Sequence, residues 1–161
     1  MMSEDEGYTL RGVIVQCTNA KRDGSHPARD LYDESTYFKK QRRFAEEIGD
    51  YWFIQSAEHG LVNPSTTIES YDTHAGDIDD PEAWAKGIAE DLTDSPLQPG
   101  DTIVVLGGSD YADPLAPELE RLGYDVVEPL RGLSIGERMS KLNEMVNEAI
   151  NGKIENAGRC D

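Results

Sequence analysis

A cysteine, a lysine and a histidine that could take part in catalysis follow two short predicted strands of this chain. Residues 11–17 form a β-branched run that ends at Cys17, with Lys21 four residues further on, and residues 51–57 form a second run that ends shortly before His59. A neighbouring lysine or histidine favours the reactive thiolate form of a cysteine, and histidine serves as a general acid or base near neutral pH. Cys17, Lys21 and His59 are therefore candidate catalytic residues. The alternative is that Cys17 is a buried packing residue and that His59 only caps or bridges its loop.

A third predicted strand, residues 102–106, leads into Gly107-Gly108-Ser109 just before a predicted helix. Backbone N–H groups at such a turn, together with the amino terminus of the helix, can bind an anion such as a phosphate. The segment lacks the lysine of a P-loop and the full glycine spacing of a dinucleotide fingerprint, so a simple tight turn is the alternative.

Two tyrosines close to charged residues are suited to a planar ligand such as a nucleobase. Tyr32 lies three residues after Arg29, and Tyr71 precedes Asp72. Stacking combined with hydrogen bonds would hold such a ligand, although both tyrosines could instead fold their loops onto the core. The candidate ligand-binding residues are Thr18, Asn19, Arg29, Tyr32, Ser56, Gly60, Tyr71, Gly108, Ser109 and Arg138.

Strands and helices alternate along the chain. The predicted strands are residues 11–17, 51–57, 102–106 and 124–128. The predicted helices run from Ser35 to Gly49, from Asp80 to Asp94, from Ala112 to Leu122, and from Ser134 or Ile135 to Ile150. This alternation predicts an α/β fold with about four parallel strands and helices on both faces, a three-layer Rossmann-like arrangement. If the strand order is 2-1-3-4, Cys17 to Asn19 face Gly107 to Ser109 across a crevice at the carboxyl ends of the strands. Two long loops, residues 18–34 and 58–80, are of a length that is often functional.

The length of 161 residues suits a single domain, which we place at residues 9–151. The acidic start, residues 1–8, is expected to be disordered, and residues 152–161 form a polar tail. We expect no cofactor and no metal site, because His26, His59 and His74 are widely separated and Cys17 and Cys160 form no paired-cysteine motif.

The sequence also predicts the cellular compartment of the protein. No apolar run approaches the roughly twenty residues of a membrane span. The amino terminus lacks the basic and apolar regions of a secretory signal. We therefore expect a cytoplasmic protein that does not bind membranes; the sequence leaves its oligomeric state open.

The chain is strongly acidic, with 32 Asp and Glu against 15 Lys and Arg and a net charge of −17. At molar ionic strength the screening length falls to about 3 Å, so such self-repulsion is tolerated best in a halophilic cytoplasm. An acidic partner-binding protein or a nucleic-acid mimic is the alternative. One basic cluster, Lys39, Lys40, Arg42 and Arg43, could contact nucleic acid or form the solvated face of a helix.

Several segments in the same order resemble a family of small archaeal, bacterial and phage proteins classed as a domain of unknown function, DUF6884. The resemblance rests on residues 17–21, 28–32, Phe38, 52–61, Pro64, Ile68, Tyr71-Asp72, Pro129-Leu130, Gly132-Leu133, Ile135-Gly136 and Arg138. The family usually has lysine where this chain has Glu58. A more distant similarity to the YaaA stress proteins, with His59 in place of their tyrosine, implies DNA binding, and a short similarity to an archaeosine-synthase domain implies nucleobase chemistry.

Residues and resemblance together lead to two functional expectations. The first is a small α/β protein that binds or modifies a nucleotide, nucleobase or nucleic acid in the crevice at the carboxyl ends of the first three strands. The second is a non-catalytic nucleic-acid-binding or stress-response module.

Overall fold

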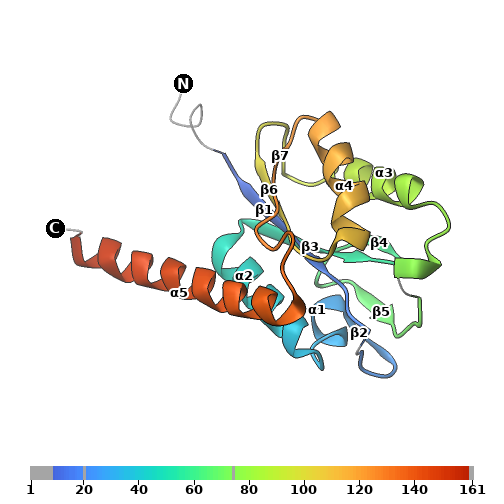
Figure 1. The fold of residues 1–161 in the computed structure, drawn as a ribbon, viewed down its shortest axis with the longest axis horizontal. Coiled ribbons are helices and arrows are strands. Elements are labelled where there is room, and N and C mark those ends of the chain that lie inside the picture. Colours follow the sequence, from blue (N-terminus) through green and yellow to red (C-terminus); the bar gives the residue numbers. More distant parts are fainter. Residues whose placement is uncertain (1–8, 20, 74, 160–161) are drawn as a thin grey trace.

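The computed structural model describes residues 9–19, 21–73 and 75–159, which form a mixed α/β domain around a five-stranded, mostly parallel sheet (Figure 1). The strand order is β4-β3-β1-β6-β7, in which β4 alone pairs antiparallel, with β3. The strands are β1 (Arg11–Gln16), β3 (Tyr51–Ser56), β4 (Gly60–Val62), β6 (Thr102–Val105) and β7 (Asp125–Val127). The four parallel strands follow the 2-1-3-4 order expected from the sequence, so the first and third predicted strands, β1 and β6, are neighbours.

Helices flank this sheet, and alternate residues of β1 face different helices because successive side chains of a strand point to opposite faces. Val13 and Val15 belong to a buried cluster with residues of α2 and α5, whereas Ile14 belongs to a second cluster with residues of α3 and α4. The helices are α1 (Ala28–Leu31), α2 (Thr36–Ile48), α3 (Pro81–Leu92), α4 (Ser109–Arg121) and α5 (Ile135–Arg159). No helix within residues 9–19, 21–73 and 75–159 has the length and apolar character needed to cross a membrane.

The helix starts follow from local sequence. The Ser35 hydroxyl accepts a hydrogen bond from the Phe38 N–H at 3.1 Å, and the Asp80 carboxylate accepts one from the Ala83 N–H at 3.1 Å, with Pro81 in the first turn of α3. Each cap pairs an N–H group that the helix itself cannot pair. These two starts agree with the sequence prediction.

Both long loops contain structure that the sequence did not predict. β2 (Ser25–Pro27) and β5 (Thr67–Glu69) form a separate two-stranded antiparallel sheet that joins the two loops, and β4 turns back against β3 as a hairpin. A 3-10 turn, η2 (Ala75–Asp77), precedes α3. These strands are three residues long, too short for an alternating pattern to be recognisable, and they depend on partners far away in sequence.

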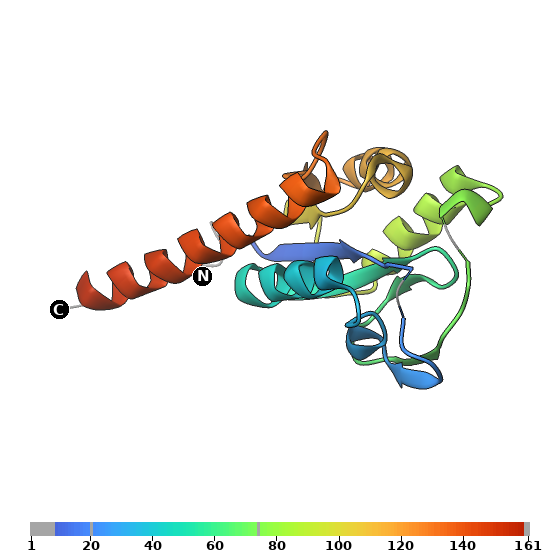
Figure 2. The ribbon, with the colours of Figure 1, turned by 60° about the horizontal axis from the view of Figure 1, so that its bottom comes forward.

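Two helix ends also differ from the prediction. α4 begins at Ser109 rather than at Ala112, because Gly108 is extended and the helix starts directly after it. α5 continues to Arg159, past Ile150, and extends beyond the rest of the domain (Figure 2). The expected disorder of residues 1–8 lies outside the described residues, as do the last two residues of the predicted tail.

Candidate functional site

The carboxyl ends of β1, β3 and β6 meet at one edge of the sheet, where β6 stops earlier than β1. The last bond between these two strands runs from the Leu106 N–H to the Ile14 carbonyl at 2.9 Å. At Gln16 the buried side chain of Gln41 takes the place of β6: its Oε1 accepts from the Gln16 N–H at 2.8 Å and its Nε2 donates to the Gln16 carbonyl at 3.2 Å. The chain after β6 is therefore free to leave the sheet, which opens a crevice between the ends of β1 and β6.

Glycines shape the far wall of this crevice. Gly107 has a φ of +119°, and a Cβ there would lie 2.8 Å from the Gln16 side-chain oxygen, so no other residue fits without strain. The same oxygen accepts a hydrogen bond from the Gly108 N–H at 3.0 Å. Gln16 thus fixes the turn that begins α4.

The crevice contains two adjoining cavities. The first, the glycine cavity, measures about 250 Å³ and is lined by Gly107, Gly108, Ser109, Leu130, Arg131, Gly132, Leu133 and Arg138. The second, the thiol cavity, measures about 400 Å³ and is lined by Gln16, Cys17, Thr18, Asn19, Tyr37, Gly76, Asp110, Tyr111, Ile135 and Arg138. Together they reach the size range of small-molecule sites. Arg138 lines both cavities and therefore connects them.

Arg138 is held in place while its charge stays unpaired. Its Nε donates to the Leu133 carbonyl at 3.0 Å, and its guanidinium lies over Gly108, where an added Cβ would come within 3.2 Å of a terminal nitrogen. In the described part of the chain no carboxylate lies within 4.0 Å of the Arg138 guanidinium. Arg131, by contrast, pairs with Asp113 at 3.0 Å and with Glu128 at 2.9 Å.

Further polar groups around the crevice also lack protein partners. The Tyr37 side chain is 8% exposed, and its hydroxyl forms no hydrogen bond. Burial raises the pKa of this hydroxyl, and the Arg138 guanidinium lies close enough to oppose the rise. At the start of α4 the N–H groups of Ser109 and Asp110 donate to no acceptor among the described residues, since Gly108 has no side chain to cap them. Buried polar groups are rarely left unpaired, so these groups are suited to a ligand.

A second cluster of polar groups, the hydroxyl cluster of Tyr32, Tyr71 and Ser56, lies at the end of β3. The Tyr71 oxygen lies 2.8 Å from the Ser56 oxygen and 2.5 Å from the Tyr32 oxygen. Ser56 also accepts from the N–H groups of Glu58 and His59, at 3.2 and 3.0 Å. Because these two bonds use both lone pairs of the serine, the Ser56 hydroxyl donates to Tyr71. In the pair of Tyr32 and Tyr71 either hydroxyl can be the donor.

Lys21 and His59 both contact Tyr71, whereas Cys17 contacts Tyr111. Cys17 is buried, with its sulfur 3.3 Å from the Tyr111 hydroxyl. Lys21 places its Nζ 4.4 Å from the centre of the Tyr71 ring; burial lowers the pKa of this lysine, and Cys17 and Asp72 oppose the shift. His59 packs edge-on against the Tyr71 ring at a centroid distance of 5.2 Å. The described contacts therefore connect His59 with Tyr71, and Cys17 with Tyr111.

Burial and the thiol act together on the tyrosines. Burial raises the pKa values of Tyr32, Tyr71 and Tyr111 well above the ordinary value, and negative charge on Cys17 raises each of them further. All three hydroxyls therefore keep their protons at neutral pH and can act as hydrogen-bond donors.

A family model matches residues 13–144, and its description is Family of unknown function (DUF6884). The chain belongs to this family. The matched region contains both cavities and the hydroxyl cluster. No curated protein and no solved structure matches the chain.

In this DUF6884 domain the predicted ligand-binding residues fall into three groups. Thr18, Asn19, Gly108, Ser109 and Arg138 line the crevice, and Tyr32, Ser56 and Tyr71 form the hydroxyl cluster. Gly60 has a φ of +73° and begins β4, so its role is in the turn of the hairpin. Arg29 contacts other loops through its backbone, donating from its N–H to the Pro64 carbonyl at 2.9 Å and accepting from Arg42 at 3.0 Å.

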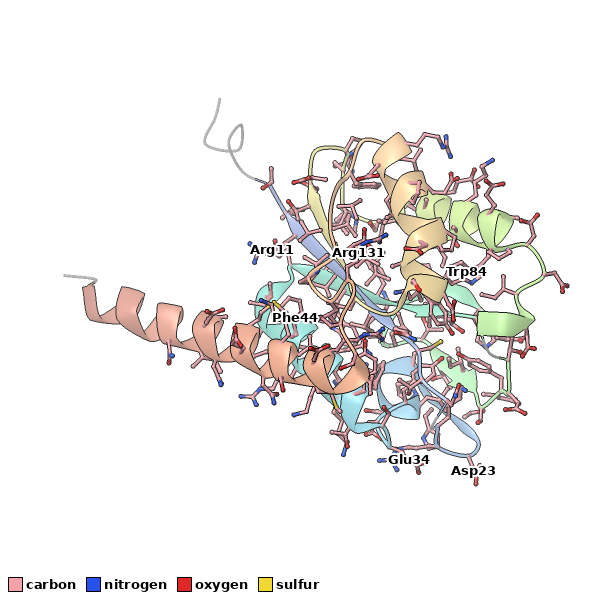
Figure 3. All side chains as sticks on the ribbon, in the orientation of Figure 1. Arg11, Asp23, Glu34, Phe44, Trp84 and Arg131 are labelled. Atoms are coloured by element: carbon pink, nitrogen blue, oxygen red, sulfur yellow. The ribbon has the colours of Figure 1, made fainter. Side chains whose placement is uncertain are left out.

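The sequence analysis missed several residues of the DUF6884 site. Gln16, Gln41 and Gln55 are polar residues in apolar surroundings, and Gln55 donates to the Leu106 carbonyl at 2.7 Å while its Oε1 stays unpaired. Trp84, labelled in Figure 3, donates to the Ser56 carbonyl at 3.0 Å and packs on Tyr111. One of these residues could have been found from the sequence, because Gln41 is a polar residue on the apolar face of a predicted helix. Tyr37, Asp110 and Tyr111 were also missed as lining residues.

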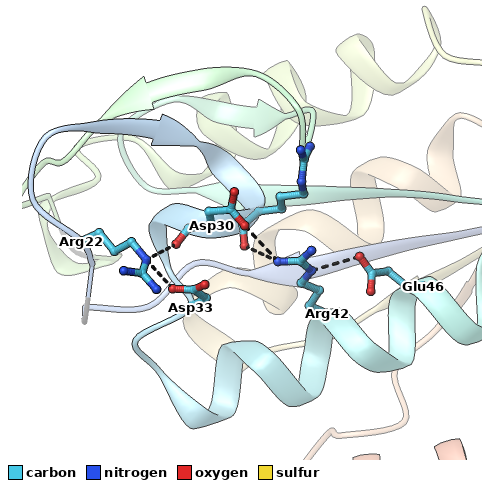
Figure 4. Close-up of polar contacts among 6 residues, drawn as sticks. Arg22, Asp30, Asp33, Arg42 and Glu46 are labelled. Carbon is cyan, nitrogen blue, oxygen red and sulfur yellow. Dashed lines mark hydrogen bonds and ion pairs between the residues drawn. The ribbon is translucent and has the colours of Figure 1, made fainter.

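The basic cluster of the DUF6884 domain is partly neutralised. Arg42 pairs with Asp30 at 3.3 Å and with Glu46 at 3.0 Å, and Arg22 pairs nearby with Asp33 at 2.6 Å (Figure 4). Lys40 donates to Asn143 on α5 at 3.0 Å. This surface therefore alternates in charge. Among the described residues no three His, Cys, Asp or Glu side chains form a group suited to a metal; His74 lies outside that part of the chain.

Proposed function

We propose that this protein binds a nucleotide-like small molecule in the crevice between β1 and β6. The observation that carries the proposal is Arg138, an unpaired guanidinium shared by a cavity of backbone donors and a cavity with aromatic walls. An acidic group would occupy the glycine cavity, and the sugar and base would occupy the thiol cavity. This is the edge at which open α/β sheets bind ligands, beside the point where the strand order reverses.

The glycine cavity supports the anionic half of the ligand. The unpaired N–H groups of Ser109 and Asp110 lie at the amino terminus of α4, a helix of 13 residues whose dipole favours negative charge there. Arg138 adds a planar set of donors suited to phosphoryl oxygens. Together these groups would replace the water that an anion loses on binding.

The thiol cavity supports the other half. Tyr37 and Tyr111 supply ring surface, the Tyr37 hydroxyl is a buried donor, and the Asp110 carboxylate can accept from sugar hydroxyls or base amino groups. For a modifying activity, Cys17 on the cavity wall is the candidate nucleophile and Lys21 its cationic neighbour. His59 would act through Tyr71, which lies against it.

Binding titrations with ribonucleoside 5′-monophosphates and with ribose 5-phosphate, in molar potassium chloride, test this function. We expect at least one nucleotide to bind more tightly than the sugar phosphate, because only the nucleotide has a base for the thiol cavity. Equal binding of the two, or no binding of any nucleotide, would contradict the proposal.

The alternative function is a non-catalytic nucleic-acid-binding or stress-response module, as the distant YaaA similarity implies. It predicts that a labelled DNA or RNA fragment binds with a strong salt dependence, and that neutralising Lys39, Lys40, Arg42 and Arg43 together weakens this binding. The pairing of Arg42 with two carboxylates favours the crevice instead.

We further propose that the helices and sheet form the three-layer Rossmann-like arrangement and that the protein works in a halophilic cytoplasm. The two buried clusters that divide the residues of β1 support the first statement. The net charge of −17 supports the second, because high salt screens the repulsion between acidic side chains.

A further inference from the structure

We infer that the crevice selects a ligand with a single phosphoryl group, a nucleoside monophosphate, over polyphosphates and nucleic-acid strands. This inference rests on the proposed function and makes its ligand class narrower. It is argued from the charges and donors that line the glycine cavity and from the unpaired hydroxyl of the thiol cavity.

The cavity walls carry one uncompensated positive charge. Arg131 and Arg138 both line the glycine cavity, but the Arg131 Nη1 lies 3.0 Å from Asp113 and 2.9 Å from Glu128. Its charge is therefore already balanced by two carboxylates. Among the described lining residues Arg138 alone remains to neutralise a ligand, which suits one phosphoryl group and leaves further phosphates without a partner.

The number of available donors agrees with this count. The Gly108 N–H is used by Gln16, so the start of α4 offers the N–H groups of Ser109 and Asp110, and Arg138 offers its terminal nitrogens. A terminal phosphoryl group has three non-bridging oxygens, which these donors can satisfy. Ser109 and Gly132 also line this cavity and offer a hydroxyl and an N–H group, so charge rather than the number of donors would limit the site to one phosphoryl group.

Carboxylates lie at three points around the crevice. Asp110 lines the thiol cavity, and Asp113 and Glu128 pair with Arg131 beside the glycine cavity. A polyphosphate chain or a phosphodiester backbone that continued past Arg138 would come into close contact with these groups, and salt screens the repulsion between partly buried charges much less than that between exposed charges. Sugar and base groups carry no such charge and can donate hydrogen bonds to Asp110.

The Tyr37 hydroxyl is an observation independent of the start of α4. This side chain is 8% exposed, lines the thiol cavity and has no hydrogen-bond partner. Burial raises the pKa of this hydroxyl, and the Arg138 guanidinium lies close enough to oppose that rise, so both groups are available to one ligand. A ligand that contacts both would extend from the glycine cavity into the thiol cavity, which a free inorganic anion would not do.

The test measures the affinities of the four common ribonucleosides, their 5′-monophosphates and 5′-triphosphates, inorganic phosphate and a short single-stranded oligonucleotide in one high-salt buffer. We expect one monophosphate to bind about tenfold or more tightly than its nucleoside and its triphosphate. Arg138→Gln should remove that advantage. Lys141→Gln is the matched control, because Lys141 lies one turn further along α5 and lines neither cavity.

A gain-of-function variant tests the charge argument separately. Asp113→Asn combined with Glu128→Gln frees Arg131 from both of its ion pairs, which involve partly exposed side chains and are expected to contribute little to stability. We expect this variant to gain more affinity for triphosphates than for monophosphates. An unchanged preference would contradict the role given to Arg131.

The remaining outcomes separate this inference from the proposed function. If triphosphates bind most tightly and Arg138→Gln weakens their binding, the inference is wrong and the proposed function stands. If the oligonucleotide binds most tightly, the single-phosphoryl inference is also wrong. If nucleosides bind as tightly as monophosphates and Arg138→Gln has no effect, the proposed function and the inference both fail, because both depend on Arg138. If inorganic phosphate binds as tightly as every nucleotide, or if nothing binds, the proposed function and the inference both fail.

Discussion

The crevice and the hydroxyl cluster lie at the same edge of the sheet but differ in how their polar groups are paired. In the hydroxyl cluster, the Ser56 side chain makes three hydrogen bonds and the Tyr71 hydroxyl makes two. In the crevice, Arg138 has no carboxylate partner within the described chain and the Tyr37 hydroxyl has no partner. A fully paired network rigidifies the fold, whereas unpaired groups beside a cavity are suited to a ligand. The comparison assigns a positioning role to the hydroxyl cluster and a binding role to the crevice.

The largest effect should come from Gly107→Ala. The φ of +119° is strained for alanine, and the new Cβ would lie 2.8 Å from the Gln16 oxygen that anchors the turn. We expect the free energy of unfolding to fall by about 3 kcal/mol, measured by chemical denaturation. Gly24→Ala is the control, since Gly24 also has a positive φ but has no atom close to its Cβ position. Equal losses in the two variants would show that backbone strain alone, and not the contact with Gln16, matters.

Removing the centre of the hydroxyl cluster should have the next largest effect. Ser56→Ala leaves the N–H groups of Glu58 and His59 and the Tyr71 oxygen without their partner, so we expect a loss of about 2 kcal/mol in the free energy of unfolding. Ligand binding should persist in the folded variant. Ser140→Ala, at an exposed position of α5, serves as the control. A stable variant that no longer binds ligand would reverse the roles that the comparison assigns.

Alkaline pH should weaken the hydroxyl cluster in a specific way. The raised pKa values of Tyr32 and Tyr71 mean that the folded protein keeps protons that the unfolded chain releases above about pH 10. The free energy of unfolding therefore falls as pH rises through that range, by about 1.4 kcal/mol per pH unit for each such tyrosine. The lowered pKa of Lys21 acts in the opposite sense, because the folded protein releases that proton first.

Tyr71→Phe removes one of these tyrosines. Above about pH 10, the free energy of unfolding of the variant should therefore fall less steeply with pH, by about 1.4 kcal/mol per pH unit. Denaturation curves between pH 8 and 11 measure this slope for both proteins. Tyr51→Phe is a suitable control, since Tyr51 is 40% exposed. Identical slopes in the wild type and Tyr71→Phe would contradict the account of the hydroxyl cluster.

Gly108→Ala should change the stability of the protein less than the preceding variants do, but it should clearly weaken nucleotide binding. The added Cβ would lie 3.2 Å from a terminal nitrogen of Arg138 and would displace the guanidinium slightly, while the φ of −84° suits alanine. We expect a change of less than about 0.5 kcal/mol in the free energy of unfolding and a several-fold weaker affinity for the nucleotide. Gly136→Ala, where a Cβ meets no atom within 4 Å, should bind normally. Equal nucleotide affinities of Gly108→Ala and Gly136→Ala would contradict the binding role of Arg138.

The sequence predicted where the crevice lies in the fold, but it did not predict the hydrogen bonds that shape it. Alternation of elements predicted a parallel sheet, and a 2-1-3-4 strand order, one of the few arrangements that such a sheet allows, placed Cys17 to Asn19 opposite Gly107 to Ser109. The amide bonds of Gln41 to Gln16 span 25 residues, and no local pattern indicates them. Tyr32 and Tyr71 were predicted to bind a planar ligand, but in the structure their hydroxyls bond to each other. That pairing depends on how two long loops meet, which propensity and spacing do not determine.

The most direct test of the binding role of the crevice is a nuclear magnetic resonance titration of the ¹⁵N-labelled protein with a nucleoside monophosphate. We predict the largest chemical-shift changes at the backbone amides of Ser109 and Asp110, which have no protein acceptor in the described structure. The amides of Glu58 and His59, already bonded to Ser56, should change little. The largest changes at Glu58, His59 and Tyr71, with Ser109 and Asp110 unaffected, would contradict the account and place the ligand at the hydroxyl cluster.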